Sequence, residues 1–351
     1  MNENLLQKTG NGRIISYDII RLFGAFAVVW LHSTDRGIYH YYHSGNWEIA
    51  IFYASLVRWA VPIFIMVSGA LFLDLSKRIE IGKLWRKNIT HIFLIFIFWS
   101  AIYTLYSGIS GKEFSDIFKN LIQGPYHLWF LKLLIGLYIV VPILRTVLEG
   151  RMESYFILLS TIAVFVIPLI LHFIGYYSMP AQSVLEGFYS ALDIKMVSGY
   201  VGYFVLGHYL SHHQLKRHVI YSIYLLGILS VVMVCTLTYY ETLRIGYPTE
   251  AFFSNLYAFT FLEATALFLF LTRLRIPEKY HQLLINASGK TLGIYIIHVL
   301  VMEVVTKQWG IDEVSYNLVL YTPCYTVSIF CISFILISIL TRLPLLKKFV
   351  S

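Results

Sequence analysis

Two ionisable residues in the first apolar segment have the types and the spacing that a reaction inside a membrane would need. The segment YDIIRLFGAFAVVWLH (17–32) contains Arg21 and His32, which are eleven residues apart. Eleven residues make close to three helical turns, so both side chains share one face of the predicted helix, roughly 16 Å apart along its axis. Histidine acts as a general base or transient nucleophile near neutral pH, and arginine binds phosphate or polarises a carbonyl group. Ionisable groups are costly in hydrocarbon, so this face is predicted to line a protein interior or a watery cavity.

Two aspartates accompany this pair. Asp18 precedes Arg21 by three residues and lies near the same face, where we predict that it is a structural partner of Arg21. Asp35 follows His32 by about one turn, where a carboxylate would orient the imidazole or stabilise its charge. The alternatives are that His32 is only an interfacial residue and that Arg21 is only structural.

Two later apolar segments bring further candidates. The stretch HLWFLKLL places His127, Trp129 and Lys132 together at the outer interface of the membrane. Snorkelling of the side chain also explains Lys132, and an interfacial belt of aromatic residues also explains Trp129. The stretch SGKTLGIYIIH places Tyr295 and His298 one turn apart on one helix face. Histidines, arginines and lysines spread over several apolar segments are thus the groups that could do chemistry, and His127 is the residue here that calls for a test.

A basic segment, SKRIEIGKLWRKN (76–88), follows the second apolar stretch and includes Lys83, Arg86 and Lys87. A phosphorylated soluble donor would bind such a cluster through charge-assisted hydrogen bonds. The accumulation of Lys and Arg in cytoplasmic loops predicts the same cluster without any ligand. The charge pattern leaves both interpretations open.

Three other features interrupt the apolar segments. Pro62 and Gly69 are predicted to break helix regularity, which is tolerated only where protein or water satisfies the freed backbone groups. Glu263 lies among apolar neighbours and is predicted to be paired or protonated. Motifs of serine hydrolases, zinc proteases, P-loops and dinucleotide-binding domains do not occur, and no metal site is predicted.

The composition identifies the elements that position these residues. Hydrophobic residues make up 58% of the 351 residues and charged residues 13%, against about 25% charged in soluble domains. We therefore predict an all-α integral membrane protein, a bundle of about ten transmembrane helices. A span needs about 20 apolar residues. The expected spans are 14–33, 49–73, 88–107, 126–147, 154–173, 196–211, 219–239, 253–272, 286–305 and 317–341.

The basic residues set the predicted orientation. With both termini cytoplasmic, seventeen Lys and Arg residues fall in inner segments and six in outer ones. Topology thus explains the net charge of +8 without a nucleic-acid partner. The aromatic outer loops 39–47 and 175–193 would anchor at the interface or stack on a sugar. No cleavable signal peptide is expected, and residues 1–351 are predicted to form a single domain. The three cysteines are expected to be small buried hydrophobes.

The sequence resembles the acyltransferase-3 family of integral membrane acyltransferases. Four passages carry the resemblance in the expected order: YDIIRLFGAFAVVWLH, VPIFIMVSGALFL with the basic KLWRKN, HLWFLKLLIGLYIVVPIL, and GKTLGIYIIH. The resemblance implies ten spans and transfer of an acyl group, usually acetyl, from cytoplasmic coenzyme A to an extracytoplasmic acceptor. Acceptors in the family are mostly sugars of surface or secreted polysaccharides.

The resemblance also implies roles for residues. Arg21 and His32 match the essential pair of the family, and Lys83, Arg86 and Lys87 stand where its basic donor-binding motif is found. This chain has Lys83 where that motif often has arginine, so the bidentate geometry toward phosphate is lost there. We expect acetyl-CoA to contact this segment, Arg21, Tyr295 and His298, and the acceptor to contact Asp35, His127, Trp129 and Lys132.

The expected function is an O-acetyltransferase of the bacterial inner membrane, with the bilayer and a saccharide acceptor as its partners and His32 as general base or transient acyl carrier. The alternative is a transporter or exporter of a polysaccharide or small polar solute, because a cavity lined by ionisable groups suits transport equally well. Import of a small amino acid for a partner enzyme is a second alternative. The sequence leaves the acceptor, the acyl group and a possible homodimer undecided.

Overall fold

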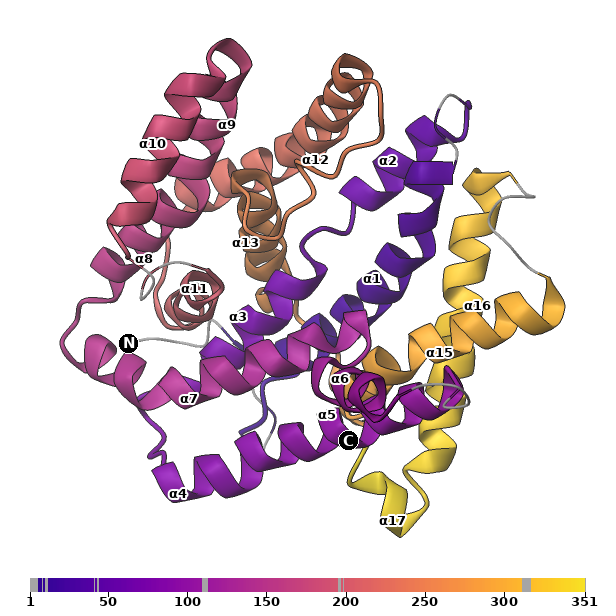
Figure 1. Cartoon of the computed structure of the whole chain (residues 1–351). Helices are drawn as coiled ribbons and strands as arrows, with labels where there is room; N and C mark the ends of the chain where they lie inside the picture. Colours follow the sequence, from indigo (N-terminus) through magenta and orange to yellow (C-terminus); the bar gives the residue numbers. More distant parts are fainter. Residues whose placement is uncertain are drawn as a thin grey trace. The chain divides into compact units, whose positions relative to one another are not determined.

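The computed structural model describes Leu6, Gln7, Thr9, 12–40, 42, 44–108, 113–194, 197, 199–310 and 317–350, except for the side chains of 35, 36, 40 and 309. Its regular elements are helices throughout these residues (Figure 1). The chain divides into two compact units, each described by itself: residues 1–20, 51–76 and 143–275 form unit 1, and residues 21–50, 77–142 and 276–351 form unit 2. The predicted all-α class is confirmed. Whether the whole chain is one functional domain stays a prediction.

The helices of both units follow the predicted apolar segments. Three helices have residues in both units: α1 (Ile15–His40), α2 (Trp47–Ser55) and α7 (Trp129–Glu149). Unit 1 also contains α3 (Ala60–Phe72), α8 (Glu153–Thr161), the π-helix η3 (Ile162–Val166), α9 (Ile167–Tyr177), α10 (Met179–Ala191), α11 (Val201–His212), α12 (Arg217–Ile245) and α13 (Ala258–Thr272). Unit 2 contains α4 (Ile81–Lys83), the π-helix η1 (Leu84–Ile89), α5 (Thr90–Tyr106), α6 (Phe114–Gln123), η2 (Tyr126–Leu128), η4 (Glu278–Tyr280), α14 (His281–Ser288), α15 (Thr291–Trp309), α16 (Leu318–Leu340) and α17 (Pro344–Lys347).

The number of spans differs from the prediction. Among the described residues, eight helical segments are long and apolar enough to cross a membrane. The expected spans 196–211 and 253–272 correspond to the shorter helices α11, with 12 residues, and α13, with 15. An α-helix rises about 1.5 Å per residue, so α11 alone covers about 18 Å of a hydrocarbon core of about 30 Å. The count of ten is therefore not confirmed by helix length.

The second span is broken near Pro62, as predicted. The α-helix α2 ends at Ser55, and α3 begins at Ala60, so that Pro62 falls in the first helical turn, where its missing N–H is not needed. In the break, the Arg58 Nε donates to the carbonyl of Ala54 over 3.1 Å. The same carbonyl accepts a long hydrogen bond of 3.4 Å from the Val57 N–H, so the side chain adds to a weak backbone contact at the break.

Gly69 does not break α3, contrary to the prediction. It lies inside the helix, at the point where α3 and α11 are closest together. A Cβ atom at Gly69 would lie 1.8 Å from the carbonyl oxygen of Phe204, and one at Gly207 would lie 2.0 Å from the carbonyl oxygen of Met66. The missing side chains let the two backbones touch, as small residues do between membrane helices.

Two further expectations need correction. The expected outer loop 175–193 is mostly helix α10, which packs against α9 in unit 1 (Figure 1). Its Met179 and Pro180 start a helix because Ser178 caps it, accepting a hydrogen bond from the Ala181 N–H. All three cysteines are free, but Cys324 and Cys331 are exposed and Cys235 is only partly covered. An apolar helix in a bilayer can turn small hydrophobes toward lipid as readily as toward protein, so composition did not predict burial.

Candidate active site

Helix α1 places His32 in a cluster of aromatic rings within unit 2. As predicted, α1 is one continuous helix that contains both Arg21 and His32. The half-buried imidazole of His32 lies 5.2 Å from the ring of His298 and 5.5 Å from the ring of Tyr126, measured between ring centroids. Three segments far apart in the sequence therefore meet at this histidine.

His298 lies on α15 and is fully buried. Its Nδ1 is 2.7 Å from the carbonyl oxygen of Tyr295. A carbonyl oxygen only accepts hydrogen bonds, so Nδ1 carries the hydrogen and Nε2 of the neutral ring has a free lone pair. That Nε2 is buried and has no hydrogen-bond partner. His298 therefore presents an unoccupied proton acceptor next to His32.

His127 provides a second nitrogen of the same kind. It lies in η2, immediately before α7, and is 1% exposed. Its Nε2 is 3.2 Å from the carbonyl oxygen of Ile296, so Nε2 donates, and the buried Nδ1 is left without a partner. The rings of His127 and His298 lie 5.6 Å apart. The three histidines thus form one group, with His298 between the other two.

Two tyrosines fix the position of this group. The hydroxyl of Tyr295 donates to the carbonyl oxygen of His127, which links α15 to η2. The hydroxyl of Tyr103, on α5, donates to the carbonyl oxygen of Ile296 over 2.8 Å and accepts from the Leu300 N–H over 3.1 Å. A regular helix would join Leu300 and Ile296 directly, so the hydroxyl is inserted into the hydrogen-bond ladder of α15. The same carbonyl also accepts from His127, which sets the orientation of that imidazole.

This group is suited to proton transfer and nucleophilic attack. A neutral imidazole with a bare nitrogen accepts a proton from a hydroxyl or attacks an activated carbonyl group. Both bare nitrogens are buried among aromatic rings, where an interaction with a developing charge is stronger than in water. Within the described part of the chain, no three His, Cys, Asp or Glu side chains are placed to hold a metal ion.

The comparison with known proteins decides the family. The family model described as acyltransferase domain matches residues 14–338, which is nearly the whole chain. The chain belongs to the acyltransferase-3 family. No curated protein and no solved structure matches it. The sequence resemblance is thereby confirmed, and the protein is a multi-pass membrane acyltransferase.

Four of the residues predicted for the site meet in this acyltransferase: His32, His127, Tyr295 and His298. The sequence did not single out Tyr103 and Tyr126, which complete the group. Tyrosine occurs 27 times in the chain and is common at membrane interfaces, so its type alone carried no signal. Tyr103 lies on the buried face of α5 together with Trp99, and the sequence does not distinguish the two.

His127 and Lys132 have different surroundings. Lys132 is exposed, donates to the carbonyl oxygen of Gln123 over 2.8 Å and lies over the ring of Phe96. The side chain snorkels outward because its ammonium group gains hydrogen bonds there, whereas His127 points inward. Trp129 packs edge-on to Phe130, and the side chain of Asp35 lies outside the described residues. Acceptor contacts by Trp129, Lys132 and Asp35 stay predictions.

The cations predicted to bind the donor lie on helical backbone. Lys83 ends α4, while Arg86 and Lys87 lie in the π-helix η1; all three are exposed. Lys83 forms an exposed ion pair with Glu80 at 2.7 Å, which competes with any phosphate for that ammonium group. Short π-helices are frequent at functional sites. Arg21 is half-buried on α1. The donor-binding roles of these residues stay predictions.

Asp18 has a partner that the sequence did not predict. Its carboxylate accepts two hydrogen bonds from the guanidinium group of Arg13, at 2.6 and 2.8 Å. This hydrogen bonding raises the pKa of Arg13 above its ordinary value. Asp18 lies in the first turn of α1, where a negative charge also stabilises the helix. The pair fixes the start of the helix that presents Arg21 and His32.

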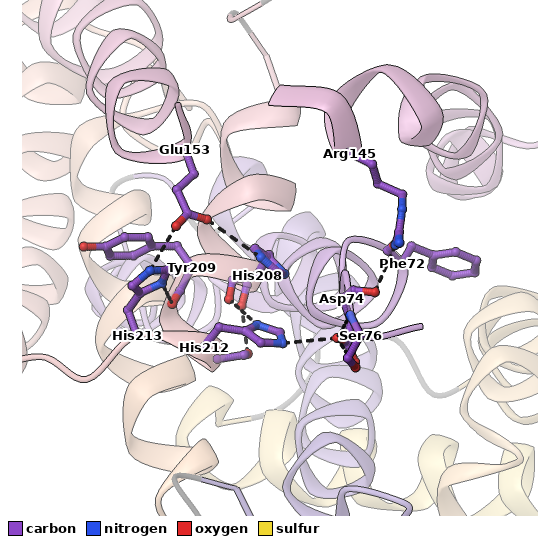
Figure 2. A network of polar contacts seen from close by, with 11 residues as sticks. Phe72, Asp74, Ser76, Arg145, Glu153, His208, Tyr209, His212 and His213 are labelled. Atoms are coloured by element: carbon purple, nitrogen blue, oxygen red, sulfur yellow. Dashed lines mark hydrogen bonds and ion pairs between the residues drawn. The ribbon is translucent and has the colours of Figure 1, made fainter. Parts of the chain in front are cut away.

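A second polar network, which the sequence did not reveal, lies in unit 1 (Figure 2). Glu153 at the start of α8 contacts two histidines of the end of α11: His213 Nε2 at 3.0 Å and His208 Nε2 at 3.8 Å. Next to them, His212 Nε2 lies 3.6 Å from a carboxylate oxygen of Asp74. In sequence, these groups occur at helix ends and look like solvated loop residues, which is why they gave no signal.

Backbone carbonyls fix the orientation of two histidines in this network. The Nδ1 of His213 is 3.2 Å from the carbonyl oxygen of Tyr209, and the Nδ1 of His212 is 2.9 Å from that of His208. Both Nδ1 atoms therefore donate, and the Nε2 atoms face the carboxyl groups of Glu153 and Asp74. The network holds the ends of α3, α8 and α11 together and contains none of the predicted site residues.

Proposed function

We propose that this acyltransferase transfers an acetyl group from acetyl-CoA to a hydroxyl group of an extracytoplasmic or lipid-linked saccharide in the bacterial inner membrane. The observation that supports this most directly is the meeting of His32, His127 and His298, with two bare imidazole nitrogens in a shielded place. Acyl transfer to a hydroxyl needs a group that takes up the hydroxyl proton. We assign this role to the imidazole of His32, and the bare nitrogens of His127 and His298 are able to accept the proton from it.

In the direct form of the reaction, the oxygen of the acceptor hydroxyl attacks the thioester carbonyl while His32 accepts the proton of that hydroxyl. The carbon–sulfur bond then breaks, and the coenzyme A thiolate takes the proton from the imidazolium. In the covalent form, His32 first attacks the thioester, and coenzyme A leaves as the thiolate. The acceptor oxygen then takes the acetyl group from the acetyl-imidazolium, and the hydroxyl proton goes to the thiolate. Both forms balance without a further reactant. Lys83, Arg86, Lys87 and Arg21 would bind the phosphates of the donor.

The test is transfer of labelled acetyl from acetyl-CoA by purified protein in liposomes, with acceptor saccharides from the producing cell. His32→Ala should lower the rate by a factor of about 10² to 10⁴, the usual contribution of a general base, while binding of acetyl-CoA is kept. His218→Ala is the matched control, because His218 is an exposed histidine on α12 in unit 1. Arg86→Ala and Arg21→Ala should instead weaken acetyl-CoA binding.

Two results would overturn the proposal. Undiminished transfer by folded His32→Ala would exclude His32 as base or acyl carrier. Purified wild-type protein that neither binds coenzyme A nor hydrolyses its thioester would exclude the donor and favour a transporter of a polysaccharide or small polar solute. Equal losses of acetyl-CoA binding in His32→Ala, Arg86→Ala and Arg21→Ala would indicate misfolding. The thermal unfolding of each variant would reveal it.

A further inference from the structure

A buried carboxyl group without a hydrogen-bond partner lies in unit 1. Glu263, on α13, is 3% exposed, and neither of its carboxyl oxygens has a hydrogen-bond partner. A buried polar group without a hydrogen bond costs about 1–3 kcal/mol. Such a group in a native structure calls for an explanation, and one explanation is a ligand that supplies the hydrogen bond.

Glu263 forms part of the wall of a cavity of about 350 Å³. Small-molecule pockets span about 300–1,000 Å³, so the cavity is large enough for part of a ligand. Apart from Glu263, its wall is made of aromatic and aliphatic residues of α12, α13 and the segment before α3: Trp59, Tyr224, Gly227, Ile228, Val231, Ala266, Leu267 and Phe270. The wall thus combines one polar group with a long apolar surface.

The cavity opens toward the lipid. Ile228 is 67% exposed and Phe270 is 49% exposed, and α12 is one of the segments able to span a membrane. In a bilayer, exposed apolar side chains on a spanning helix contact hydrocarbon. A ligand can therefore reach Glu263 from within the membrane.

The charge near Glu263 limits what this ligand is. Arg58 interacts electrostatically with Glu263, and its guanidinium group lies 3.8 Å above the ring of Phe253. Because a buried cation is already present, a second cation would be repelled at short range. A neutral group that donates a hydrogen bond fits better, and a hydroxyl is the simplest such group that a lipid carries.

We propose that this cavity binds a neutral, hydroxyl-bearing lipid from the bilayer, whose hydroxyl donates to Glu263 and whose chain lies against Val231, Leu267 and Phe270. The site is made of unit 1 residues alone, whereas the histidine group lies in unit 2. It therefore adds a lipid-binding function that does not depend on the proposed acetyl transfer.

The experiment uses the full chain in phosphatidylcholine nanodiscs and a long-chain alcohol with a photoactivatable diazirine in its chain. A second probe is the methyl ether of the same alcohol, which keeps the chain and loses the donor. We expect mass spectrometry to find the alcohol cross-linked to residues 224–231 and 266–270. Labelling by the ether should be about tenfold weaker, as expected for the loss of a hydrogen bond to a carboxyl group.

The variants separate binding from folding. Glu263→Leu should abolish the preference for the alcohol, whereas Glu263→Gln keeps an acceptor oxygen and should keep the preference. Val231→Trp fills the cavity and should lower labelling by both probes. Val232→Trp is the matched control, because the neighbouring Val232 is 55% exposed and not part of the cavity wall. Equal labelling of the wild-type protein by both probes, or unchanged labelling of folded Val231→Trp, would overturn the proposal.

Discussion

The histidine group depends on single atoms, above all on which nitrogen carries hydrogen. In both His127 and His298, a backbone carbonyl fixes the tautomer and leaves the other nitrogen bare. The carbonyl of Ile296 is shared between His127 and Tyr103, so the orientation of the imidazole depends on a tyrosine hydroxyl from another helix. Tyr103 is therefore a positioning residue in the proposed reaction.

Tyr103→Phe tests this role. The variant removes a hydroxyl that is inserted between the Leu300 N–H and the Ile296 carbonyl. We expect the free energy of unfolding to fall by about 1 kcal/mol, the usual net value of one hydrogen bond. The turnover of acetyl transfer should fall about tenfold because His127 loses its fixed orientation, while the KM for acetyl-CoA stays the same. Steady-state kinetics and thermal unfolding in detergent measure both.

Tyr106→Phe is the control for Tyr103→Phe. Tyr106 lies on the same helix, is 37% exposed and has the ammonium group of Lys307 over its ring, a contact that a phenylalanine keeps. Its turnover should match that of the wild-type protein. A folded Tyr103→Phe with full turnover would show that the hydroxyl does not position the site.

Sequence reasoning identified the single residues better than their partners. His32, His127 and His298 attracted attention because ionisable side chains in apolar segments are costly and rare. Their meeting depends on how α1, α15 and η2 pack, which a period of 3.6 residues does not predict. Asp18 illustrates the same limit: helical spacing suggested Arg21 as its partner, which stays a prediction, but gave no sign that the chain before the helix brings Arg13 to it. Local pattern gave the candidates, and tertiary packing gave the contacts.

At the scale of elements, close contact between helices stabilises unit 1. The α3 and α11 helices touch through Gly69 and Gly207, and most of α11 is buried. The prediction that Gly69 breaks its helix is wrong, because a glycine that breaks a helix and one that permits a close approach look alike in sequence.

Gly69→Ala tests the close contact. The added Cβ would lie 1.8 Å from the Phe204 carbonyl oxygen, which is backbone and cannot rotate away. The helices must separate, so we expect a loss of at least about 2 kcal/mol in the free energy of unfolding. Thermal unfolding followed by circular dichroism measures it.

Gly136→Ala provides the comparison for Gly69→Ala. Gly136 lies inside α7, and nothing lies within 4 Å of its Cβ position. Alanine there should raise the stability slightly, by about 0.5–1 kcal/mol, since glycine disfavours helix. Equal unfolding temperatures of Gly69→Ala and the wild-type protein would contradict the proposed packing.

At the scale of the whole molecule, the open question is whether α11 crosses the membrane. Two hydrogen bonds show how a short helix can complete a span: the Tyr189 hydroxyl donates to the Ala163 carbonyl, and the Ser160 hydroxyl donates to the Val197 carbonyl. The end of α10 therefore lies beside the middle of the 153–177 segment, so α10 returns part of the way and α11 continues. Helix α10 has 13 residues and α11 has 12, so the two helices end to end would cover about 38 Å.

The second polar network supports the same path. Asp74 and Glu153 belong to segments that the distribution of Lys and Arg assigns to the cytoplasmic side. Their contacts with His212 and His213 bring the end of α11 to them. If α11 crosses and α13 crosses after it, the chain has ten spans. If neither crosses, it has eight, and only the loops on either side of α12 change sides.

Two single-cysteine variants distinguish these paths. In a background with Cys235, Cys324 and Cys331 replaced by serine, ten spans predict that Lys216→Cys is cytoplasmic and that Tyr247→Cys is outside. A membrane-impermeant maleimide added to intact cells should then label Tyr247→Cys, and should label Lys216→Cys only after permeabilisation. Lys87→Cys and Phe114→Cys calibrate the assay, because both counts place Lys87 inside and Phe114 outside. The reverse pattern at Lys216 and Tyr247 would establish eight spans, with α10 and α11 folded back to the outer side, and would leave the end of α11 too far from Asp74 and Glu153 for the contacts in Figure 2.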